Sequence, residues 1–283
     1  MPDLFDPATI AAIRERLADL DELARRREAA LKTSPAPGSR AAADRSLHEE
    51  ARLVTIYAGQ ASAAALDHLH AWRLLANGPE IPIRAHLTLL RGALESADRC
   101  RWHLDASVDP GTRVGRAIAT RRDDQVERSK FEASIEGGPR PDRPIKGRTA
   151  LERIAELDDP DAVRERTDAG VRVVGFTDAT GVLASYGHER WFRLSSGLAH
   201  NKEWALAATD LEISDEPPIA PKTGSGRFSA SAPIALALTI VTTQAFRAAV
   251  ADLEAYVAPA PGPIVTFGRA VRRRMERRRR DRR

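Results

Sequence analysis

Two residues with complementary chemistry, Arg193 and His200, lie seven positions apart. Seven residues are close to two turns of an α-helix, so a helix would place both side chains on one face. Ser196, one turn before the histidine, and Trp204, one turn after it, fall on the same stripe. A guanidinium binds phosphate through a planar fork, and an imidazole can move a proton near neutral pH. The set predicts chemistry on a phosphate, with Ser196 and Asn201 positioning the phosphate or the imidazole.

The same spacing also has a structural interpretation. A single histidine on a helix is commonly a packing or boundary residue, and an arginine two turns away is commonly its neighbour at the surface. On this interpretation Arg193 and His200 simply hold helices together.

The spacing Arg193-x6-His200 resembles the R-x4-6-H signature of the HEPN superfamily of helical domains. In many HEPN proteins this pair forms a metal-independent ribonuclease site, usually completed across a dimer. The resemblance therefore implies a helical bundle, RNA or a nucleotide as partner, a homodimer, and a role in defence or as a toxin. Similar bacterial proteins of the uncharacterised HEPN type carry an Arg-x3-Glu on an early helix, which implies that Arg91 and Glu95 line the same cavity as His200. The alternative for Arg91 and Glu95 is an amphipathic surface strip.

Two functions follow from this resemblance. The first is a metal-independent endoribonuclease, in which His200 acts as general acid or base and Arg193 stabilises the phosphorane-like transition state. The second is a non-catalytic nucleotide- or RNA-binding or assembly module, in which Arg193 and His200 bind phosphate or are structural. Active HEPN nucleases favour a polar residue directly after the arginine, where this chain has Leu194, and this departure favours the second function.

Composition favours helices and separates a basic tail from the rest of the chain. Aromatic residues make up 5% of the sequence, and the net charge is +4. The segment from Gly268 to Arg283 holds ten arginines against Glu276 and Asp281, so it carries +8 and the preceding chain carries −4. So many like charges predict a tail that is disordered on its own. This tail either binds nucleic acid or an anionic surface, or only keeps the protein in solution.

Neither a cofactor site nor a metal site is expected. The seven histidines are dispersed, Cys100 is the single cysteine, and the HExxH, CxxC and GxxxxGK[ST] patterns are missing. Cys100 is expected to be a buried packing residue. No run approaches 18 apolar residues and the N-terminus lacks an apolar signal core, which predicts a cytoplasmic protein that is not integral to a membrane.

Apolar periodicity and breakers predict the elements that position these residues. The fold class expected is all-α, an up-and-down bundle of HEPN-like type. Helices are expected over residues 7–31, 41–76, 82–103, 111–135, 151–157, 179–209 and 233–257. The most apolar of these, 233–257, is expected to lie centrally, and the helix over 179–209 is expected to break near Gly187.

Smaller features complete the expected layout. Residues 171–175 alternate and favour an extended piece, while Arg113 and Arg116 either face a phosphate or lie on a solvated helix face. His188 is expected to be exposed near a helix start. The chain then divides into an N-terminal helix and linker (1–40), a HEPN-like bundle (41–258), and a Pro-rich linker with the Arg-rich tail (259–283). The first helix is expected to pack on the bundle or to serve as a dimerisation arm.

Overall fold

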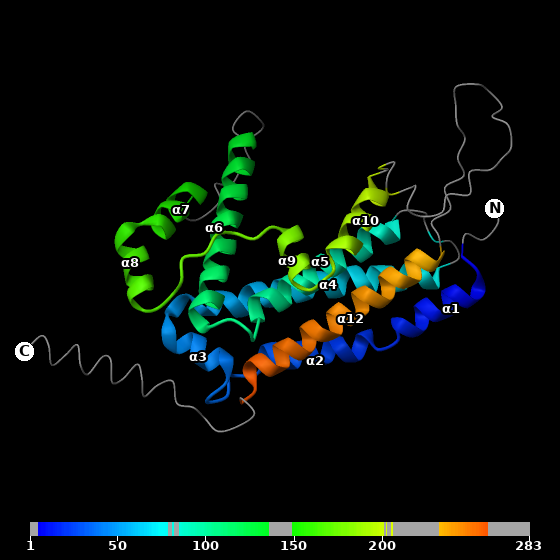
Figure 1. The fold of residues 1–283 in the computed structure, drawn as a ribbon, viewed down its shortest axis with the longest axis horizontal. Helices are drawn as coiled ribbons and strands as arrows, with labels where there is room; N and C mark the ends of the chain where they lie inside the picture. Colours follow the sequence, from blue (N-terminus) through cyan, green and yellow to red (C-terminus); the bar gives the residue numbers. More distant parts are fainter. Residues whose placement is uncertain are drawn as a thin grey trace, which may run out of the picture.

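The computed structural model describes residues 5–78, 81, 85–135, 149–200, 202, 205 and 232–259. Within these residues the chain forms helices and irregular connections without a β-strand, which confirms the all-α bundle (Figure 1). The helices are α1 (Pro7–Arg16), α2 (Leu20–Lys32), α3 (Arg40–Leu47), the 3-10 helix η1 (Glu49–Ala51), α4 (Arg52–Asn77), α5 (Ala85–Leu104), α6 (Pro110–Ile135), α7 (Ala150–Asp158), α8 (Pro160–Asp168), α9 (Ala179–Ser185), α10 (Glu189–Ala199) and α12 (Ala232–Val257). The predicted tail lies outside the described residues.

Three long helices, α4, α5 and α12, form the centre of the molecule (Figure 1). Their facing side chains are fully buried, among them Trp72, Leu90, Leu238 and Phe246. Trp72 donates its indole N–H to the Thr239 hydroxyl over 3.0 Å, so the polar edge of the largest core side chain is satisfied. Burying each large apolar side chain contributes about 1.5–3 kcal/mol. The expectation that the last apolar helix lies centrally is confirmed.

Helix α12 is also long and apolar enough to span a membrane by length and composition. Its most apolar window has a mean hydropathy of 1.6, and half of that window is buried inside the protein. Core helices meet the same criterion. Its buried residues include Thr242 and Thr243, and Thr243 donates to the Thr239 carbonyl over 2.8 Å.

The first two helices pack on this centre. Ile13 of α1 and Leu23 of α2 are buried, as are Leu17 and Leu20 around the turn between them. The sequence predicts one continuous helix here, whereas the structure breaks it: Leu17 caps α1, and α2 begins at Leu20. The break changes the direction of the chain, and both α1 and α2 contact α12 and α4.

A second break divides the helix predicted over residues 41–76. His48 adopts an extended backbone with φ −158° and ψ 152°, and its Nδ1 accepts the Glu50 backbone N–H over 3.2 Å. The imidazole therefore caps the 3-10 helix η1, which leads into α4. Neither glycine nor proline marks this position, which is why the apolar pattern alone predicted continuity.

Helix starts follow the local sequence closely. Asp6 accepts the Thr9 backbone N–H over 2.9 Å, and Asp178 accepts that of Gly181 over 2.8 Å. Thr149 and Glu152 form a reciprocal capping box at the start of α7. These caps confirm the predicted starts near residues 7, 151 and 179.

The connection from α8 to α9 crosses helix α6 at its two glycines. The Arg172 backbone N–H donates to the Gly111 carbonyl over 3.1 Å, and the Arg172 carbonyl lies directly against Gly115. Farther along, Arg99 donates to the Thr177 carbonyl over 2.7 Å and so ties the connection to α5. The predicted extended piece at 171–175 is irregular backbone docked on a helix, not a strand.

Buried charges are neutralised within the bundle. Arg113 of α6 is 2% exposed and makes a bidentate pair with Asp44 of α3, over 2.9 and 2.7 Å. Asp44 also accepts the Tyr256 hydroxyl of α12 over 2.9 Å. Arg116 donates to the Trp102 carbonyl and lies over the Trp102 ring. Both arginines therefore have internal partners, and the expectation that they face a phosphate or a solvated face is wrong.

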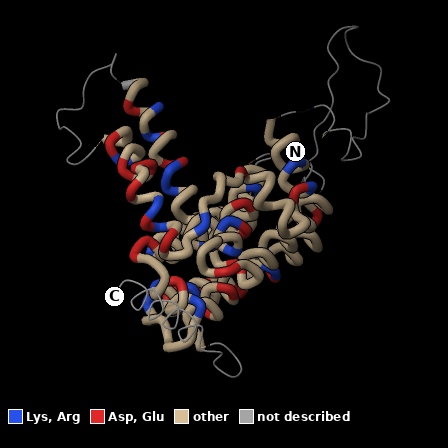
Figure 2. The backbone as a smooth tube through the Cα atoms, turned by 60° about the vertical axis from the view of Figure 1, so that its left-hand side comes forward, with Lys and Arg blue, Asp and Glu red and all other residues tan. Residues whose placement is uncertain are grey.

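Charged residues of both signs alternate along the described helices (Figure 2). Many form pairs between elements, such as Arg26 with Glu254 over 2.7 Å and Arg247 with Asp19 over 2.9 Å. Exposed pairs of this kind contribute roughly 0–1 kcal/mol each. Cys100 is fully buried, as expected, and desolvation raises the pKa of its thiol.

Candidate functional site

Helix α10 carries the predicted arginine and histidine. The turn at Gly187, with φ +73°, separates it from α9, which confirms the predicted break. The helix ends at Ala199, so His200 is its C-cap residue instead of a mid-helix residue. The His200 backbone N–H still donates to the Ser196 carbonyl over 3.0 Å, which places these two predicted residues one turn apart.

Arg193 does not pair with His200. Its Nε donates to Glu189 Oε1, one turn earlier on α10, over 2.6 Å. The Arg193 side chain is 60% exposed, so this pair holds the guanidinium only weakly. Arg193 remains reachable by an anion from solution, but it is not part of a preformed pair with the histidine.

His200 instead meets Arg91 of α5. Arg91 Nη1 and His200 Nε2 lie 3.5 Å apart, at the outer limit of a hydrogen bond. The Arg91 guanidinium also lies over the Phe192 ring, with 4.7 Å between Cζ and the ring centroid. Its Nε is buried without a hydrogen-bond partner. Among the described residues Arg91 forms no ion pair with a carboxylate, so this half-buried cation is left with unused donors.

Glu95 lies one turn beyond Arg91 on the same face of α5 and is half-buried. Arg91 and Glu95, four residues apart, do not form an ion pair, because the Arg91 guanidinium turns towards Phe192 and His200. The structure thus brings Arg91 and His200 together and leaves Glu95 beside them without a described ion pair. Two other predicted residues, Asn201 and Trp204, lie outside the described residues.

A buried carboxylate next to this region was not singled out from the sequence. Asp98 of α5 is fully buried, and its Oδ2 lies 2.7 Å from His188 Nδ1. The His188 side chain is 21% exposed, so the expectation that it is an exposed residue is wrong in that respect. No sequence signal marks this contact, because the two residues are 90 positions apart.

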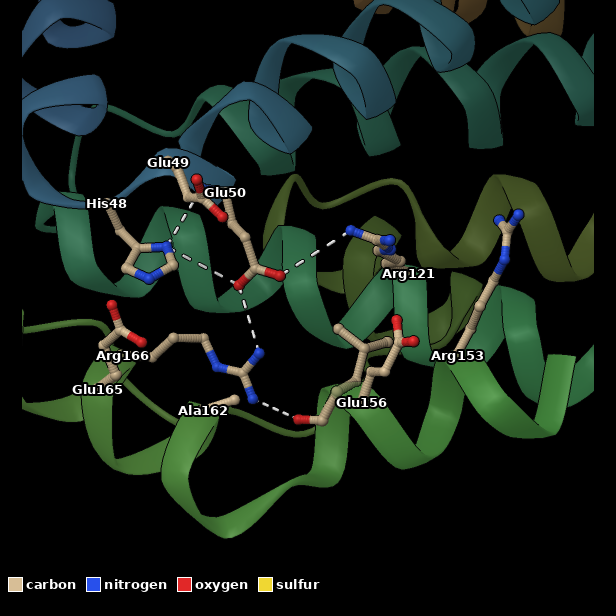
Figure 3. A pocket seen from close by; sticks show the side chains of 10 residues that line it. His48, Glu49, Glu50, Arg121, Arg153, Glu156, Ala162, Glu165 and Arg166 are labelled. Atoms are coloured by element: carbon tan, nitrogen blue, oxygen red, sulfur yellow. Dashed lines mark hydrogen bonds and ion pairs between the residues drawn. The ribbon is translucent and has the colours of Figure 1, made fainter. Parts of the chain in front are cut away.

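A second region with several charged side chains lies between η1, α6, α7 and α8. It is a cavity of about 170 Å³, and Figure 3 shows its charged lining. Glu50 lies at its centre and interacts with Arg166 over 3.4 Å and Arg121 over 3.9 Å, while His48 Nδ1 is 3.9 Å away. Its most buried cation, Arg166, also donates to the Leu157 carbonyl. The central carboxylate of this cavity thus has two guanidinium partners, whereas Arg91 has no carboxylate partner among the described residues.

Metal binding has no geometric support in the described part of the chain, where no three His, Cys, Asp or Glu side chains converge on one point.

Comparison with known proteins identifies no relative of this chain. No protein-family model matches the chain, and no curated protein or solved structure matches it. The HEPN resemblance therefore stays a prediction that depends on the spacing of Arg193 and His200.

Proposed function

We propose that the face shared by α5 and α10 binds a phosphate group of RNA or of a nucleotide between Arg91 and His200. The observation that carries this proposal is the 3.5 Å approach of Arg91 Nη1 to His200 Nε2, without a carboxylate pairing with Arg91 among the described residues. A phosphate oxygen entering this gap would accept hydrogen bonds from the guanidinium and from a protonated imidazole. It would also supply a negative charge, which no carboxylate among the described residues provides to Arg91.

Arg193 supplies a second, exposed guanidinium on the same helix as His200. Its loose pairing with Glu189 makes it suited to exchange a surface carboxylate for a phosphate. The role proposed for Arg193 is thus attraction of the polyanion, and that of Arg91 is direct contact. This division moves the direct phosphate contact from Arg193 to Arg91, which the resemblance already implied beside His200.

Fluorescence anisotropy of a labelled RNA oligonucleotide in EDTA tests the binding proposal. Arg91→Gln and His200→Gln are each expected to raise the Kd about tenfold, which corresponds to about 1.4 kcal/mol. Arg122→Gln is the control, because it removes the same single charge from an arginine that pairs with Asp158 of α7 and not with α10. Equal affinities for wild type, Arg91→Gln and Arg122→Gln would refute the proposal.

Metal-independent RNA cleavage is the second candidate. It is supported by His200, whose exposed imidazole reaches the same guanidinium that would hold the phosphate. In this scheme His200 Nε2 takes the proton of the ribose 2′-OH, and the 2′-oxygen attacks phosphorus. The P–O5′ bond breaks and the 5′-oxygen takes up a proton from solvent, while the imidazolium returns its proton to solvent, leaving a 2′,3′-cyclic phosphate. Arg91 stabilises the extra charge of the pentacovalent transition state.

Incubation of RNA with the protein in EDTA distinguishes cleavage from binding. Cleavage predicts cyclic-phosphate ends with wild type and a loss of at least 100-fold in rate with His200→Gln. Binding without cleavage predicts intact RNA in both samples together with the affinity losses described above.

A further inference from the structure

Helix α10 is attached to α5 at both of its ends. Near its C-terminal end, His200 approaches Arg91, whose guanidinium also lies over the ring of Phe192 in the first half of α10. At its N-terminal end, His188 contacts Asp98. From His188 to His200 the residue numbers increase along α10, whereas those of their partners decrease along α5, from Asp98 to Arg91. The two helices therefore run antiparallel. Arg91 and Asp98 are seven residues apart, which is about 10 Å along α5.

The contact at the N-terminal end is the more constrained of the two. Asp98 is fully buried, so its carboxylate needs internal partners. It has two: His188 Nδ1 at 2.7 Å and Arg101 Nη1 at 3.4 Å. With Asp98 ionised, His188 must donate its Nδ1–H, which fixes both the tautomer and the orientation of the imidazole.

The turn that carries His188 is held to the same part of α5. The Tyr186 ring lies under the Arg101 guanidinium, 4.1 Å from ring centroid to Cζ. Gly187 adopts φ +73°, a conformation that a side chain would strain, and the His188 backbone N–H donates to the Leu183 carbonyl over 2.9 Å. The start of α10 is therefore fixed in position and direction by side chains of α5.

The main packing partners of α10 among the described elements are α5 and α9. A helix of 11 residues is about 16 Å long, so a tilt of roughly 10° about its start moves its far end by about 3 Å. A movement of this size would remove the 3.5 Å contact between Arg91 and His200. The geometry of the phosphate site thus depends on what holds the other end of the helix.

We infer that Asp98 and His188 are positioning residues for the Arg91–His200 site: their contact sets the direction of α10 and thereby the gap in which the phosphate binds. This inference rests on the proposed function for its functional consequence. Neither residue touches the ligand. Their effect on RNA passes through Arg91 and His200, so it must disappear when that contact is already lost.

A double-mutant cycle on RNA affinity tests this dependence. Asp98→Ala and Arg91→Gln are each expected to raise the Kd about tenfold, and the double variant is expected to raise it about tenfold as well. A hundredfold loss in the double variant would show independent effects and overturn the inference. Asp98→Asn keeps both the buried side-chain volume and a hydrogen-bond acceptor for His188. Its RNA affinity is therefore expected to be close to that of wild type and higher than that of Asp98→Ala.

The matched control is Asp44→Asn, measured at a temperature where every variant is folded. Asp44 is equally buried but pairs with Arg113 and Tyr256, away from α10. It is expected to lower thermal stability without a change in RNA affinity. Equal losses of affinity in Asp44→Asn and Asp98→Ala would assign the effect to general destabilisation and overturn the inference.

An NMR measurement without RNA separates this inference from the proposed function. The ¹⁵N resonances of His200, assigned with His200→Gln, are expected to shift in Asp98→Ala as the imidazole moves away from Arg91. Unchanged His200 resonances would overturn the positioning role even if RNA binds. If the resonances shift while wild type binds no RNA, the phosphate proposal fails and the positioning of α10 by Asp98 stands.

Discussion

Arg113 and Arg91 show how the surroundings of one side-chain type decide its role. Arg113 is 2% exposed, makes a bidentate pair with Asp44 and donates to the carbonyls of Asp105 and Val108. Its charge and its donors are satisfied inside the bundle. Arg91 is half-buried against an aromatic ring and has a buried Nε without a partner. The first arginine holds helices together, and the second is the one that we propose binds an anion.

The buried cluster of Asp44, Arg113 and Tyr256 gives the first stability prediction. Asp44→Ala leaves a buried guanidinium without its carboxylate, so we expect the free energy of unfolding to fall by about 3–5 kcal/mol. Tyr256→Phe removes one hydrogen bond and should cost about 0.5–1.5 kcal/mol. Urea denaturation monitored by circular dichroism measures both. A cost below about 1 kcal/mol for Asp44→Ala would contradict a structural role for the pair.

His103 of α5 is a buried polar residue that the fold does not satisfy. It is fully buried between Tyr57, at 5.7 Å between stacked rings, and Trp102, and neither ring nitrogen has a hydrogen-bond partner in the described part of the chain. Desolvation, with smaller contributions from Arg99 and Arg116, lowers the pKa of His103 to about 3. The imidazole is therefore neutral at pH 7.

Replacing this imidazole with an apolar ring is expected to stabilise the protein. His103→Phe removes two unpaired nitrogens and keeps an aromatic ring beside Tyr57, so the free energy of unfolding at pH 7 should rise by roughly 1 kcal/mol. Chemical denaturation checks the sign. A decrease of 2 kcal/mol or more would show that the nitrogens have partners or that the larger ring does not fit.

The lowered pKa of His103 also predicts a pH dependence. The unfolded chain takes up the proton near pH 6.5 and the folded protein only near pH 3, so the unfolded state binds more protons between these values. The contribution of the neutral His103 to the free energy of unfolding is fully present above pH 6.5. It falls with decreasing pH by up to about 1.4 kcal/mol per pH unit. Unfolding curves from pH 7 to pH 4 should show this slope in wild type, and His103→Phe should reduce it. Equal slopes would remove His103 as the cause.

At the residue scale the sequence predicted the helix that carries the candidate site but not the contacts of its side chains. The seven-residue spacing placed Arg193 and His200 on one helix, and backbone bonding up to His200 supports that placement. It could not show that Arg193 would pair with Glu189, or that the partner of His200 is 109 positions away on α5. Arg91 entered only through a resemblance, since no local pattern reports a contact between distant helices.

At the scale of elements, helix α6 is shaped to let another segment cross it. Gly111 and Gly115 are four positions apart, and the connection through Gly170 and Arg172 lies against both. A β-carbon at either glycine would overlap a backbone carbonyl oxygen, which has no rotamer with which to move aside. The crossing therefore requires glycine for the close approach of two backbones.

Gly115→Ala tests this crossing against a matched helical glycine. The substitution should displace the connection around Arg172 and lower the free energy of unfolding by about 2 kcal/mol or more. Gly59→Ala on α4 meets only the Leu31 side chain at 3.4 Å, so it should be neutral or gain up to about 1 kcal/mol in helix propensity. Thermal unfolding of the two variants compares them. Equal stabilities would contradict the close approach.

The helix boundaries show which breaks a sequence reveals. The break between α9 and α10 was predicted because glycine is unfavourable inside a helix, and in the structure Gly187 adopts a left-handed backbone that other residues avoid. The breaks at Leu17 and at His48 were not predicted, because both residues adopt backbone conformations open to any residue. Packing of α2 on α12 and the His48 cap on Glu50 impose them. Local sequence reports glycine-dependent breaks and not those imposed by tertiary contacts.

At the scale of the whole molecule, net charge is divided between the body and the C-terminal tail. Residues 1–267 carry −4 and residues 268–283 carry +8. The described helices show both signs intermixed (Figure 2), so we expect the tail to attract a long polyanion more strongly than the rest of the chain does.

Deleting residues 268–283 tests whether that attraction contributes to RNA binding. The shortened chain is expected to bind RNA more weakly at low salt and to show a smaller dependence of log Kd on log salt. Arg91→Gln should still raise the Kd about tenfold in the shortened chain. Identical salt slopes with and without the tail would indicate that it only keeps the protein in solution.

The overall architecture was more accessible from the sequence than the site. The 3.6-residue period of α5, α6 and α12 sets their core faces, and long apolar stripes leave few alternatives to a helical bundle. Which helices become neighbours depends on contacts such as Trp72 with Thr239, which join positions 167 apart. Such contacts are properties of the assembled fold.

The attachment of α10 at both ends has one more consequence, for the kind of motion this helix can make. Sliding along α5 by a fraction of a turn would leave neither His188 opposite Asp98 nor His200 opposite Arg91. The next matching register lies a full 5.4 Å pitch away, where new residues would face each other. We therefore expect helix α10 either to keep its present register on α5 or to detach from α5 completely, without stable intermediate positions.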